Sequence, residues 1–240
     1  MGGATDVGRV RRGNEDARLI LTVPSLTLVA VADGMGGHAG GEVASAIAIQ
    51  TLEVALAASG AAASQPGTAL RRAVEQANRA VWEAARADAA LDGMGTTMVA
   101  ALIDADGRAV IASVGDSRAY LVSDHHAERI TQDHTWVAEQ VVAGELTQHE
   151  ARTSPFRAIL TRSIGSASRV EVDLFEGVEL RAATALVLCS DGVTEYLDER
   201  DLARALGAAR TAQDAAQAMV RLAVERGGAD NATVVVAWRR

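Results

Sequence analysis

The chain has 240 residues, 49% of them hydrophobic and 22% charged, which is enough apolar material for one substantial core. Its net charge of −8 at pH 7 would repel a phosphate backbone, so nucleic acid is not an expected partner. The single cysteine, Cys189, cannot form an internal disulfide, and neither a signal peptide nor an apolar stretch of the roughly 20 residues that cross a bilayer is recognisable. We therefore expect a cytoplasmic protein that contacts no membrane.

The first part of the sequence predicts two strands followed by two helices. Residues 19–23 and 26–33 form apolar runs, and the second is apolar on both faces like a buried strand. A glycine-rich loop follows, after which apolar residues recur at helical spacing from Glu42 to a small-residue linker at 58–67. Thr68 is expected to be the N-cap of a second, longer helix.

The middle of the sequence predicts consecutive hairpins that together make a meander. Its strands are expected at 96–104, 109–116, 118–124 and 129–131. Residues 135–158 are partly helical, are interrupted at Gly144 and Pro155, and form the best candidate for a mobile flap. Strands at 170–176 and 185–191, helices at 198–206 and 211–227, and a last strand at 231–239 complete the prediction.

The order of these elements indicates the fold class. Strands come in runs and helices in pairs, without the strict alternation of a parallel sheet. This order predicts an α+β fold, a sandwich of two antiparallel β-sheets flanked by pairs of antiparallel helices. Because no internal repeat or domain boundary is visible, residues 1–240 are expected to form a single domain, with the flap at about 135–158 as a subregion.

The glycine-rich loop VADGMGGHAGGEVA first suggests a nucleotide site. Three of its residues fit the loose G-x-G-x-x-G/A pattern after a strand, namely Gly34, Gly36 and Ala39. However, Asp33 would lie beside the pyrophosphate, and the later hairpins do not supply the parallel units of a dinucleotide-binding fold. The spacing of a Walker A motif is also present, but Glu42 stands where that motif requires lysine. The loop by itself therefore disfavours bare phosphate.

Acids recur at the ends of apolar strands, at Asp33, Asp116 and Asp191, while Asp230 precedes the last strand. Any one of them alone is most simply a turn residue. If the strands lie in adjacent sheets, however, the carboxylates would repel each other and need a cation. Oxygen ligands suit Mg²⁺ or Mn²⁺, and zinc has no recognisable site.

A second charged group, RRGNED, lies at residues 11–16 just before the first predicted strand. One interpretation is a solvated charged turn. The other is an arginine that grips a phosphate beside carboxylates that hold metal. Residues alone leave both interpretations open.

Six motifs occur in one order from about residue 4 to residue 239: TDVGRVRRGNEDA, VADGMGGHAGGEVAS, GMGTT, VGDSRAYL, LCSDGV and GGADNATVVV. As an ordered set they resemble the metal-dependent protein serine/threonine phosphatases of the PPM (PP2C) type, in their compact bacterial form. The resemblance implies two antiparallel sheets flanked by helical pairs, with metal ions in a channel between the sheets at one end. This agrees with the α+β fold expected above.

The resemblance also implies a ligand set. Asp33 would bridge two metal ions, Mn²⁺ or Mg²⁺, and the backbone carbonyl of Gly34 would add a ligand to one of them. Asp191 and Asp230 would complete the protein ligands of the first ion.

Further residues correspond to the second ion, to a third ion and to the phosphate. Glu15 would lie at the second ion, directly or through water, with Asp16 in support, and Asp116 would hold a third, weaker metal. Arg11 would bind phosphate, whereas the neighbouring Arg12 is expected to point elsewhere. His38 corresponds to the proposed general acid for the leaving alkoxide, although a structural hydrogen-bonding role stays open.

The reaction implied is direct attack on phosphorus by a metal-bridging hydroxide, with no covalent phosphoenzyme. The sequence around Cys189 argues against a cysteine-dependent phosphatase, because Glu195 stands where a C-x5-R phosphatase loop requires arginine. The DADGR segment at 104–108 lies in an expected hairpin turn rather than at an aspartyl-phosphate site. The implied partners are phosphorylated proteins, targets of a serine/threonine kinase, and we expect a monomer.

Four polar residues at recurrent family positions are expected to form structural hydrogen bonds: Asn78, Thr96, Thr97 and Asn231. Two other functions remain to be considered, a non-catalytic module that binds metal or phosphopeptide and a nucleotide-binding oxidoreductase. The full acid set together with Arg11 argues against the first, and the second predicts dinucleotide binding without metal dependence.

Overall fold

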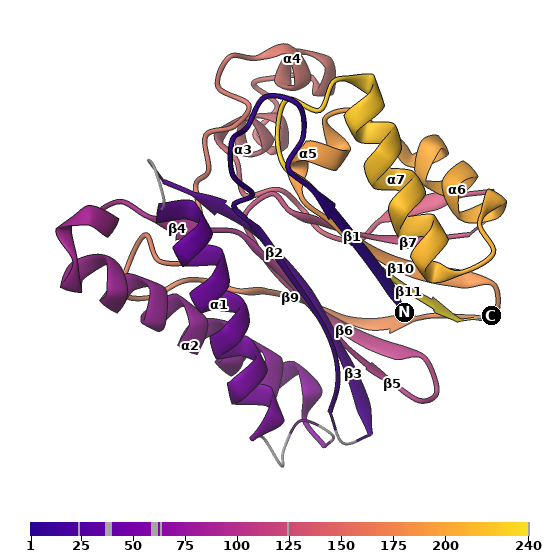
Figure 1. Cartoon of the computed structure of the whole chain (residues 1–240), viewed down its shortest axis with the longest axis horizontal. Helices are drawn as coiled ribbons and strands as arrows, with labels where there is room; N and C mark the ends of the chain where they lie inside the picture. Colours follow the sequence, from indigo (N-terminus) through magenta and orange to yellow (C-terminus); the bar gives the residue numbers. More distant parts are fainter. Residues whose placement is uncertain (24, 37–39, 59–61, 63, 124, 240) are drawn as a thin grey trace.

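Two antiparallel sheets stacked face to face form the body of the molecule (Figure 1). The structure is a computed structural model that describes residues 1–240 except 24, 37–39, 59–61, 63, 124 and 240. In spatial order, sheet A contains β1 (Gly2–Asp6), β11 (Ala232–Arg239), β10 (Thr184–Cys189), β7 (Arg118–Val122) and β8 (Ala127–Arg129). Sheet B contains β2 (Asp16–Val23), β3 (Leu26–Met35), β5 (Met98–Asp104), β6 (Arg108–Val114) and β9 (Asp173–Glu179), with the short β4 (Gly95–Thr96) paired to β3.

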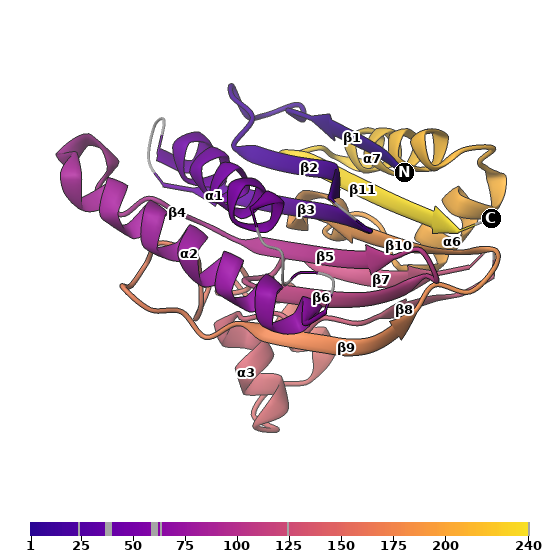
Figure 2. The ribbon, with the colours of Figure 1, turned by 90° about the horizontal axis from the view of Figure 1, so that it is seen from below.

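Helical pairs cover the outer faces of the two sheets, as Figure 2 shows from below. The pair on sheet B is α1 (Gly40–Ala57) and α2 (Pro66–Ala87), and the pair on sheet A is α6 (Glu199–Ala208) and α7 (Ala212–Arg226). In α2 the buried Leu70, Val74, Ala77 and Val81 recur at helical spacing and form the stripe that packs on the core. None of the helices in the described ranges is both long and apolar enough to cross a membrane.

The two sheets share an apolar interface. Val29, Val31, Ile111, Leu188 and Val235 are all fully buried there. Strand β3 therefore lies between helices on one face and sheet A on the other. This double burial explains why its sequence is a continuous apolar run rather than an alternating one.

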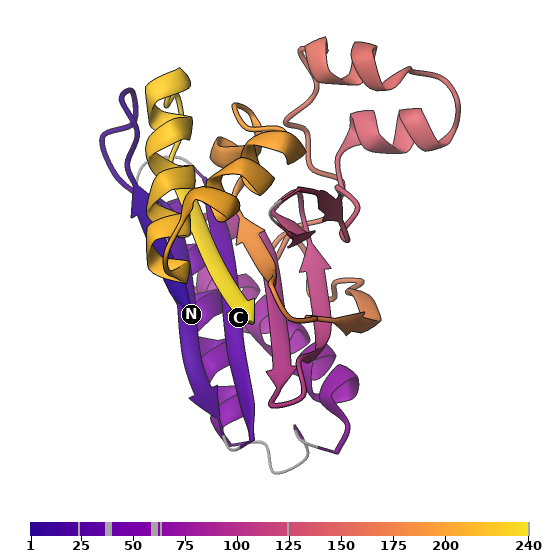
Figure 3. The same ribbon diagram turned by 90° about the vertical axis from the view of Figure 1, so that its right-hand side faces the viewer.

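Two short helices, α3 (Trp136–Val142) and α4 (Gln148–Thr153), project beyond the sheets (Figure 3). Thr135 caps α3, and Thr147 with Glu150 forms a capping box at the start of α4. Helix α3 ends before Gly144, whose φ is +78°, and α4 ends before Pro155. The expected helical pattern, interrupted at these two positions, is confirmed.

The remaining short elements are the 3₁₀ helix η1 (Ala89–Leu91) and α5 (Asp191–Thr194). All strand pairs in the described part of the chain are antiparallel, which confirms the α+β sandwich and leaves no parallel unit for a dinucleotide-binding fold. The predicted strands and long helices are present with shifts of a few residues.

Three local expectations were wrong or incomplete. Thr68 is not an N-cap, because α2 already begins at Pro66, whose fixed φ suits the first turn of a helix. The predicted meander breaks between β6 and β7, since the chain crosses there from sheet B to sheet A. Strand β1 was not expected, because its glycines have low strand propensity, and its pairing with β11 creates it.

Candidate active site

The topology brings acidic residues from both sheets to one end of the sandwich. In sheet B, Asp16 at the start of β2 is the register partner of Asp33 near the end of β3. In sheet A, Asp191 lies two residues after the last residue of β10, which lies between β7 and β11. Because both neighbours run antiparallel to β10, Asp116 before β7 and Asp230 before β11 lie at the same end.

Four of these acids are named here the acid cluster: Asp16, Asp33, Asp116 and Asp191. Asp33 shares the strand face of Val29 and Val31, which points toward sheet A. All four cluster residues are half-buried, so the site stays open to solvent. None of the salt bridges of the described residues involves these four carboxylates.

Burial and mutual repulsion disturb the pKa values of the cluster. Burial raises the pKa of Asp33 well above its usual range, and the nearby Asp16 and Asp191 carboxylates raise it further. Burial is also the largest cause that raises the pKa of Asp16 to about 7. Since Asp16 and Asp33 face each other across neighbouring strands, two negative charges there destabilise the sheet.

The acids of sheet A show the same effect. Burial, followed by repulsion from Asp191, raises the pKa of Asp116 to about 7. The pKa of Asp191 is raised by burial first, and a hydrogen bond with the Asp33 carboxyl moderates that rise. Burial and mutual repulsion thus disfavour the ionised forms of these carboxyls in the absence of a cation.

The donor set fits a divalent cation that prefers oxygen. Asp16 Oδ2 accepts a hydrogen bond from Ser190 Oγ at 2.8 Å, whereas the buried Asp16 Oδ1 has no hydrogen-bond partner in the described structure. Such a buried acceptor is a natural ligand for Mg²⁺ or Mn²⁺. In the described residues no three acid, histidine or cysteine side chains yet surround one point in ligand geometry.

The N-terminal loop adds a cation at the rim of the cluster. Arg11 is half exposed, and its Nη2 donates to Asp230 Oδ2 at 2.6 Å. This hydrogen bond is the largest cause of a raised Arg11 pKa, so the guanidinium stays charged. Burial raises the pKa of Glu15 on the same loop, and the charge of Arg11 lowers it. Arg12 is exposed.

Asn231 holds this loop against Asp230. Its Oδ1 accepts from the backbone N–H of Glu15 at 2.8 Å, and its Nδ2 donates to the carbonyls of Val7 and Gly13 at 2.9 and 3.0 Å. The backbone N–H of Asn231 in turn donates to Asp230 Oδ1 at 2.8 Å. The structural role expected for Asn231 is confirmed, and its contacts place Glu15 beside the acids.

Gly34 lies where two segments approach too closely for a side chain. Its N–H donates to the Glu15 carbonyl at 3.1 Å. A Cβ at this position would lie 2.1 Å from the Gly41 oxygen and 2.6 Å from the Glu15 oxygen. The glycine therefore lets the start of α1 pack against the N-terminal loop. His38, the candidate general acid in this loop, lies outside the described residues.

The other three polar residues expected to be structural make such bonds. Thr96 Oγ1 donates to the Asp33 carbonyl at 2.8 Å, and Thr97 Oγ1 accepts from the Asp33 N–H at 3.0 Å. Asn78 Oδ1 accepts from the Gly165 N–H at 2.8 Å. These bonds fix the backbone around Asp33 and the loop that follows the flap.

The sequence interpretation missed two polar residues at this end. Ser190 joins Asp16 of sheet B to the start of β11, because its Oγ also accepts from the Thr233 N–H at 3.0 Å. Ser117 Oγ lies 2.7 Å from Thr97 Oγ1 and so ties the crossing after β6 to sheet B. The only signal in the sequence was a small polar residue next to each strand-end acid, a pattern also common in ordinary turns.

Two alternative nucleophiles are poorly placed. Cys189 is fully buried, and burial raises its thiol pKa to about 12. Asp104 and Asp106 lie at the β5–β6 turn, at the other end of sheet B from the acid cluster, where both face the side chain of Arg108.

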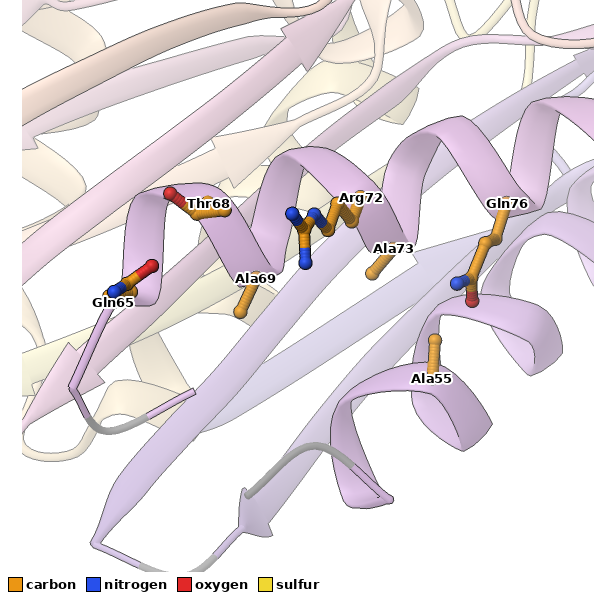
Figure 4. A pocket seen from close by; sticks show the side chains of 7 residues that line it. All are labelled: Ala55, Gln65, Thr68, Ala69, Arg72, Ala73 and Gln76. Atoms are coloured by element: carbon orange, nitrogen blue, oxygen red, sulfur yellow. The ribbon is translucent and has the colours of Figure 1, made fainter. Parts of the chain in front are cut away.

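The helical layer on sheet B contains a shallow cavity of about 220 Å³ beside α1 and α2 (Figure 4). Its lining includes Thr68, Arg72 and Gln76 but no acid. A neighbouring cavity of about 610 Å³ is lined by Arg71, Glu75, Glu176 and others. Neither cavity includes a residue of the acid cluster, so neither supplies the chemistry expected from the sequence.

Comparison with known proteins agrees with the geometry. A family model described as Protein phosphatase 2C matches residues 9–226. The serine/threonine phosphatase stp of Listeria monocytogenes is 38% identical over 238 residues, which cover 98% of this chain and 94% of that protein.

Solved structures agree as well. The serine/threonine phosphatase of S. agalactiae matches with a TM-score of 0.93 at 35% identity and covers 100% of this chain and 98% of that one. The catalytic domain of the serine/threonine protein phosphatase PstP, solved in complex with two manganese ions, has a TM-score of 0.82 at 33% identity and covers 98% and 95%. With a family model along most of its length and relatives alike in sequence and fold, the chain belongs to the protein phosphatase 2C family of serine/threonine phosphatases.

Proposed function

We propose that this phosphatase hydrolyses phosphoserine and phosphothreonine in proteins at the acid cluster, with Mn²⁺ or Mg²⁺ bound there. The observation that carries the proposal is the meeting of half-buried carboxylates from both sheets without a lysine or arginine partner in the described structure. Such a cluster is unfavourable by itself and becomes favourable once divalent cations neutralise it.

Each acid has a proposed role in holding the ions. Asp33 would hold both ions of the core site, and the Gly34 carbonyl, Asp191 and Asp230 would complete the protein ligands of the first. Glu15 would serve the second ion, directly or through water. When bound, the ions supply an acidified water as nucleophile and positive charge for the phosphoryl oxygens.

Two more acids have supporting roles in the proposal. Asp16 supports the second ion from its position opposite Asp33, where its Oδ1 is free to accept. Asp116, at the crossing between the sheets, would hold a third, weaker ion.

Arg11 is proposed to bind the phosphoryl group of the substrate. Its guanidinium uses Nη2 for Asp230 and is half exposed, so its other N–H groups are available for phosphate oxygens. Arg11 thereby orients the phosphoryl group next to the carboxylates. His38 is proposed to donate the proton to the departing serine or threonine oxygen.

The wider assignments follow from this activity. The chain is proposed to form one catalytic domain, 1–240, with residues 135–158 as a flap beside the site. In the flap, Arg157 Nη2 donates to Glu195 Oε1 at 3.1 Å, just after α5. We further propose that the protein acts in the cytoplasm as a monomer and opposes a serine/threonine kinase.

Phosphate release from an aryl phosphate and from a phosphothreonine peptide, with and without Mn²⁺, tests the proposal. Wild type is expected to depend on Mn²⁺, whereas Asp33→Ala and Asp191→Ala lose activity by on the order of 10³-fold. Asp106→Ala is the matched control, because it removes an exposed aspartate at the far end of sheet B and should keep full activity. Metal-independent release, or full activity in either cluster variant, would refute the site.

A further inference from the structure

The crossing that carries Asp116 is held on both sides by two consecutive residues, Asp133 and His134. Before Asp116, the Gly115 N–H donates to His134 Nδ1 at 3.0 Å, and the Gly115 carbonyl accepts from the His134 N–H at 3.0 Å. After Asp116, Arg118 donates from Nε and Nη2 to the Asp133 carboxylate at 3.0 and 2.8 Å. The backbone before Asp116 and the Arg118 side chain after it are therefore both bonded to one dipeptide.

The imidazole of His134 has a defined protonation state in this arrangement. A backbone N–H can only donate, so Nδ1 must carry the lone pair and the proton must be on Nε2. Nε2 then donates to Asp173 Oδ2 at 3.1 Å. His134 is 3% exposed, so solvent does not replace either contact. A neutral imidazole supplies an acceptor on one side and a donor on the other.

The same histidine lies at the root of the flap. Its carbonyl accepts from the Thr161 N–H at 2.9 Å, where the chain returns from the flap. Next to it, Arg162 Nη1 donates to Asp173 Oδ1 at 2.7 Å. Both ends of the flap thus meet at His134 and Asp173, and the His134 ring continues this network to Gly115.

Burial is the largest cause of a lowered His134 pKa, and the charged groups around the ring act on this pKa in both directions. Asp173 on β9 and the adjacent Asp133 raise the His134 pKa, and Arg162 from the flap return lowers it. The His134 pKa is lower than usual overall, so the ring is neutral at neutral pH.

The backbone conformation of Gly115 depends on its hydrogen bonds to His134. Its φ is +98°, and a Cβ here would lie 2.7 Å from Thr97 Cβ. Glycine can adopt many backbone conformations, so Gly115 does not by itself fix the peptide before Asp116. The two hydrogen bonds to His134 restrain this peptide instead.

We propose that His134 is a positioning residue, whose neutral imidazole holds the Gly115 peptide so that Asp116 faces the acid cluster. The same ring connects Asp116 to the root of the flap. The inference rests on the proposed function, in which Asp116 assists catalysis. His134 itself touches neither substrate nor ion; it acts through Gly115 and Asp173.

Two substitutions separate the two sides of the ring. In His134→Asn the amide oxygen replaces Nδ1 and can still accept from Gly115, while the contact with Asp173 is lost. In His134→Gln the amide nitrogen replaces Nε2 and can still donate to Asp173, while the acceptor for Gly115 is lost. Thermal unfolding of each purified variant verifies that it is folded.

The activity assay compares these variants with Asp116→Ala over a range of Mn²⁺ concentrations. His134→Gln is expected to behave like Asp116→Ala, with roughly tenfold lower activity at limiting Mn²⁺, since one hydrogen bond is worth about tenfold in an equilibrium. His134→Asn should stay within about threefold of wild type. In the double variant with Asp116→Ala, His134→Gln should cause no further loss, because both act on one element.

A second readout needs neither metal nor substrate. In the metal-free protein, hydrogen exchange of the Gly115 amide should be roughly tenfold faster in His134→Gln than in wild type and nearly unchanged in His134→Asn. In wild type, ¹⁵N spectra of the imidazole should report a neutral ring with its proton on Nε2 between pH 6 and 8. This spectrum keeps the test available even if a variant does not fold.

The outcomes distinguish the inference from the function beneath it. Unchanged Gly115 exchange in His134→Gln, a ring protonated on Nδ1, or losses that multiply in the double variant would overturn the inference while leaving a Mn²⁺-dependent phosphatase in place. If Asp116→Ala matches wild type at every Mn²⁺ concentration, the proposed role of Asp116 and the inference fall together. Absence of Mn²⁺-dependent activity in wild type would refute the proposed function itself.

Discussion

Two groups of acids in this fold are built in opposite ways. The acid cluster places carboxylates opposite one another at the meeting of the sheets, without an ion pair in the described structure. The second group, named here the paired acids, has arginine partners and comprises Asp133, Asp173 and Asp201. Asp133 bonds to Arg118 and Arg129, and Asp201 bonds to Arg226 through both oxygens.

The pKa values follow this difference. Burial raises those of Asp16 and Asp116 to about 7, whereas the hydrogen bond from Arg226 lowers the pKa of Asp201. Burial alone would raise the pKa of Asp173, but its bonds with Arg162 and His134 lower it overall. In the described structure the fold thus neutralises the paired acids with arginine and leaves the acid cluster, where we propose that cations bind, without such a partner. At the rim of the cluster, the proposed ligand Asp230 does pair with Arg11.

The largest effect is expected when aspartate is replaced by asparagine once in the acid cluster and once among the paired acids. Asp33→Asn should lower kcat by on the order of 10³-fold or more and yet raise the melting temperature of the metal-free protein by a few degrees, because it removes repulsion. Asp201→Asn should lower the melting temperature by roughly 5 °C, because it weakens charged hydrogen bonds, and should leave kcat unchanged. Thermal unfolding in chelator and steady-state kinetics measure both.

A metal-free protein destabilised by Asp33→Asn would contradict the view that the cluster is repulsive. If Asp201→Asn lost kcat while its melting temperature stayed unchanged, the paired acids would not be purely structural.

The next largest effect is expected in the pH dependence of the unfolding free energy, which should have opposite signs for the two groups. Asp16 and Asp116 have a folded pKa of about 7 against an ordinary value of 3.8, so between these values the folded state keeps protons that the unfolded chain has released. The unfolding free energy of the metal-free protein should therefore fall as pH rises from about 4 to 7. Asp201 acts oppositely, because its lowered pKa adds stability above its unfolded pKa that is lost as pH falls through the folded one.

Melting temperatures in chelator from pH 4 to 8 test this. The stabilisation by added Mn²⁺ should grow over the same range, since protons compete with the cation for the carboxylates. A metal-free melting temperature that rises steadily from pH 5 to 8 would show that the cluster is not strained by its charge.

Arg11 lies between these two cases, because it pairs with Asp230, an acid beside the acid cluster that belongs to neither group. Arg11→Ala should raise KM for phosphorylated substrates by about tenfold with little change in kcat, since it removes a charged contact to bound phosphate. Arg12→Ala is the matched control, an exposed neighbour that should leave KM unchanged. If kcat alone fell in Arg11→Ala, the guanidinium would act on the transition state instead.

The smallest effect is expected at Cys189. Its buried thiol, with a pKa raised to about 12, should not react with thiol reagents in the native protein. Cys189→Ala should retain activity within about twofold, since only a small cavity forms. Inactivation of the native enzyme by a thiol reagent would reopen a cysteine mechanism.

Much of this site could be predicted from the sequence because its parts are local. Asp33, Asp116 and Asp191 each end an apolar run beside a small residue, and that pattern predicts both the strand and the place of the acid at its end. The glycine-rich loop is visible in the sequence as well, but the close packing at Gly34 involves the distant Glu15 and appears only in the structure.

Other parts depend on contacts between distant segments. Nothing local indicates that Ser190 bonds to Asp16, 174 positions away, or that the His134 ring faces Gly115. The crossing between β6 and β7 was mistaken for a hairpin because strand periodicity does not report which sheet a strand joins.

By itself the sequence determined the α+β class, the strand-end acids and, through its ordered motifs, the family. Those features follow from periodicity and residue type within short windows. Only the tertiary structure decided that Asp16 faces Asp33 and that His134 bonds to the peptide before Asp116. It also decided that, among the described residues, arginines pair with other acids and not with the acid cluster. These are pairings across two sheets, and burial and repulsion act on the pKa of a carboxyl only after the sheets bring the groups together.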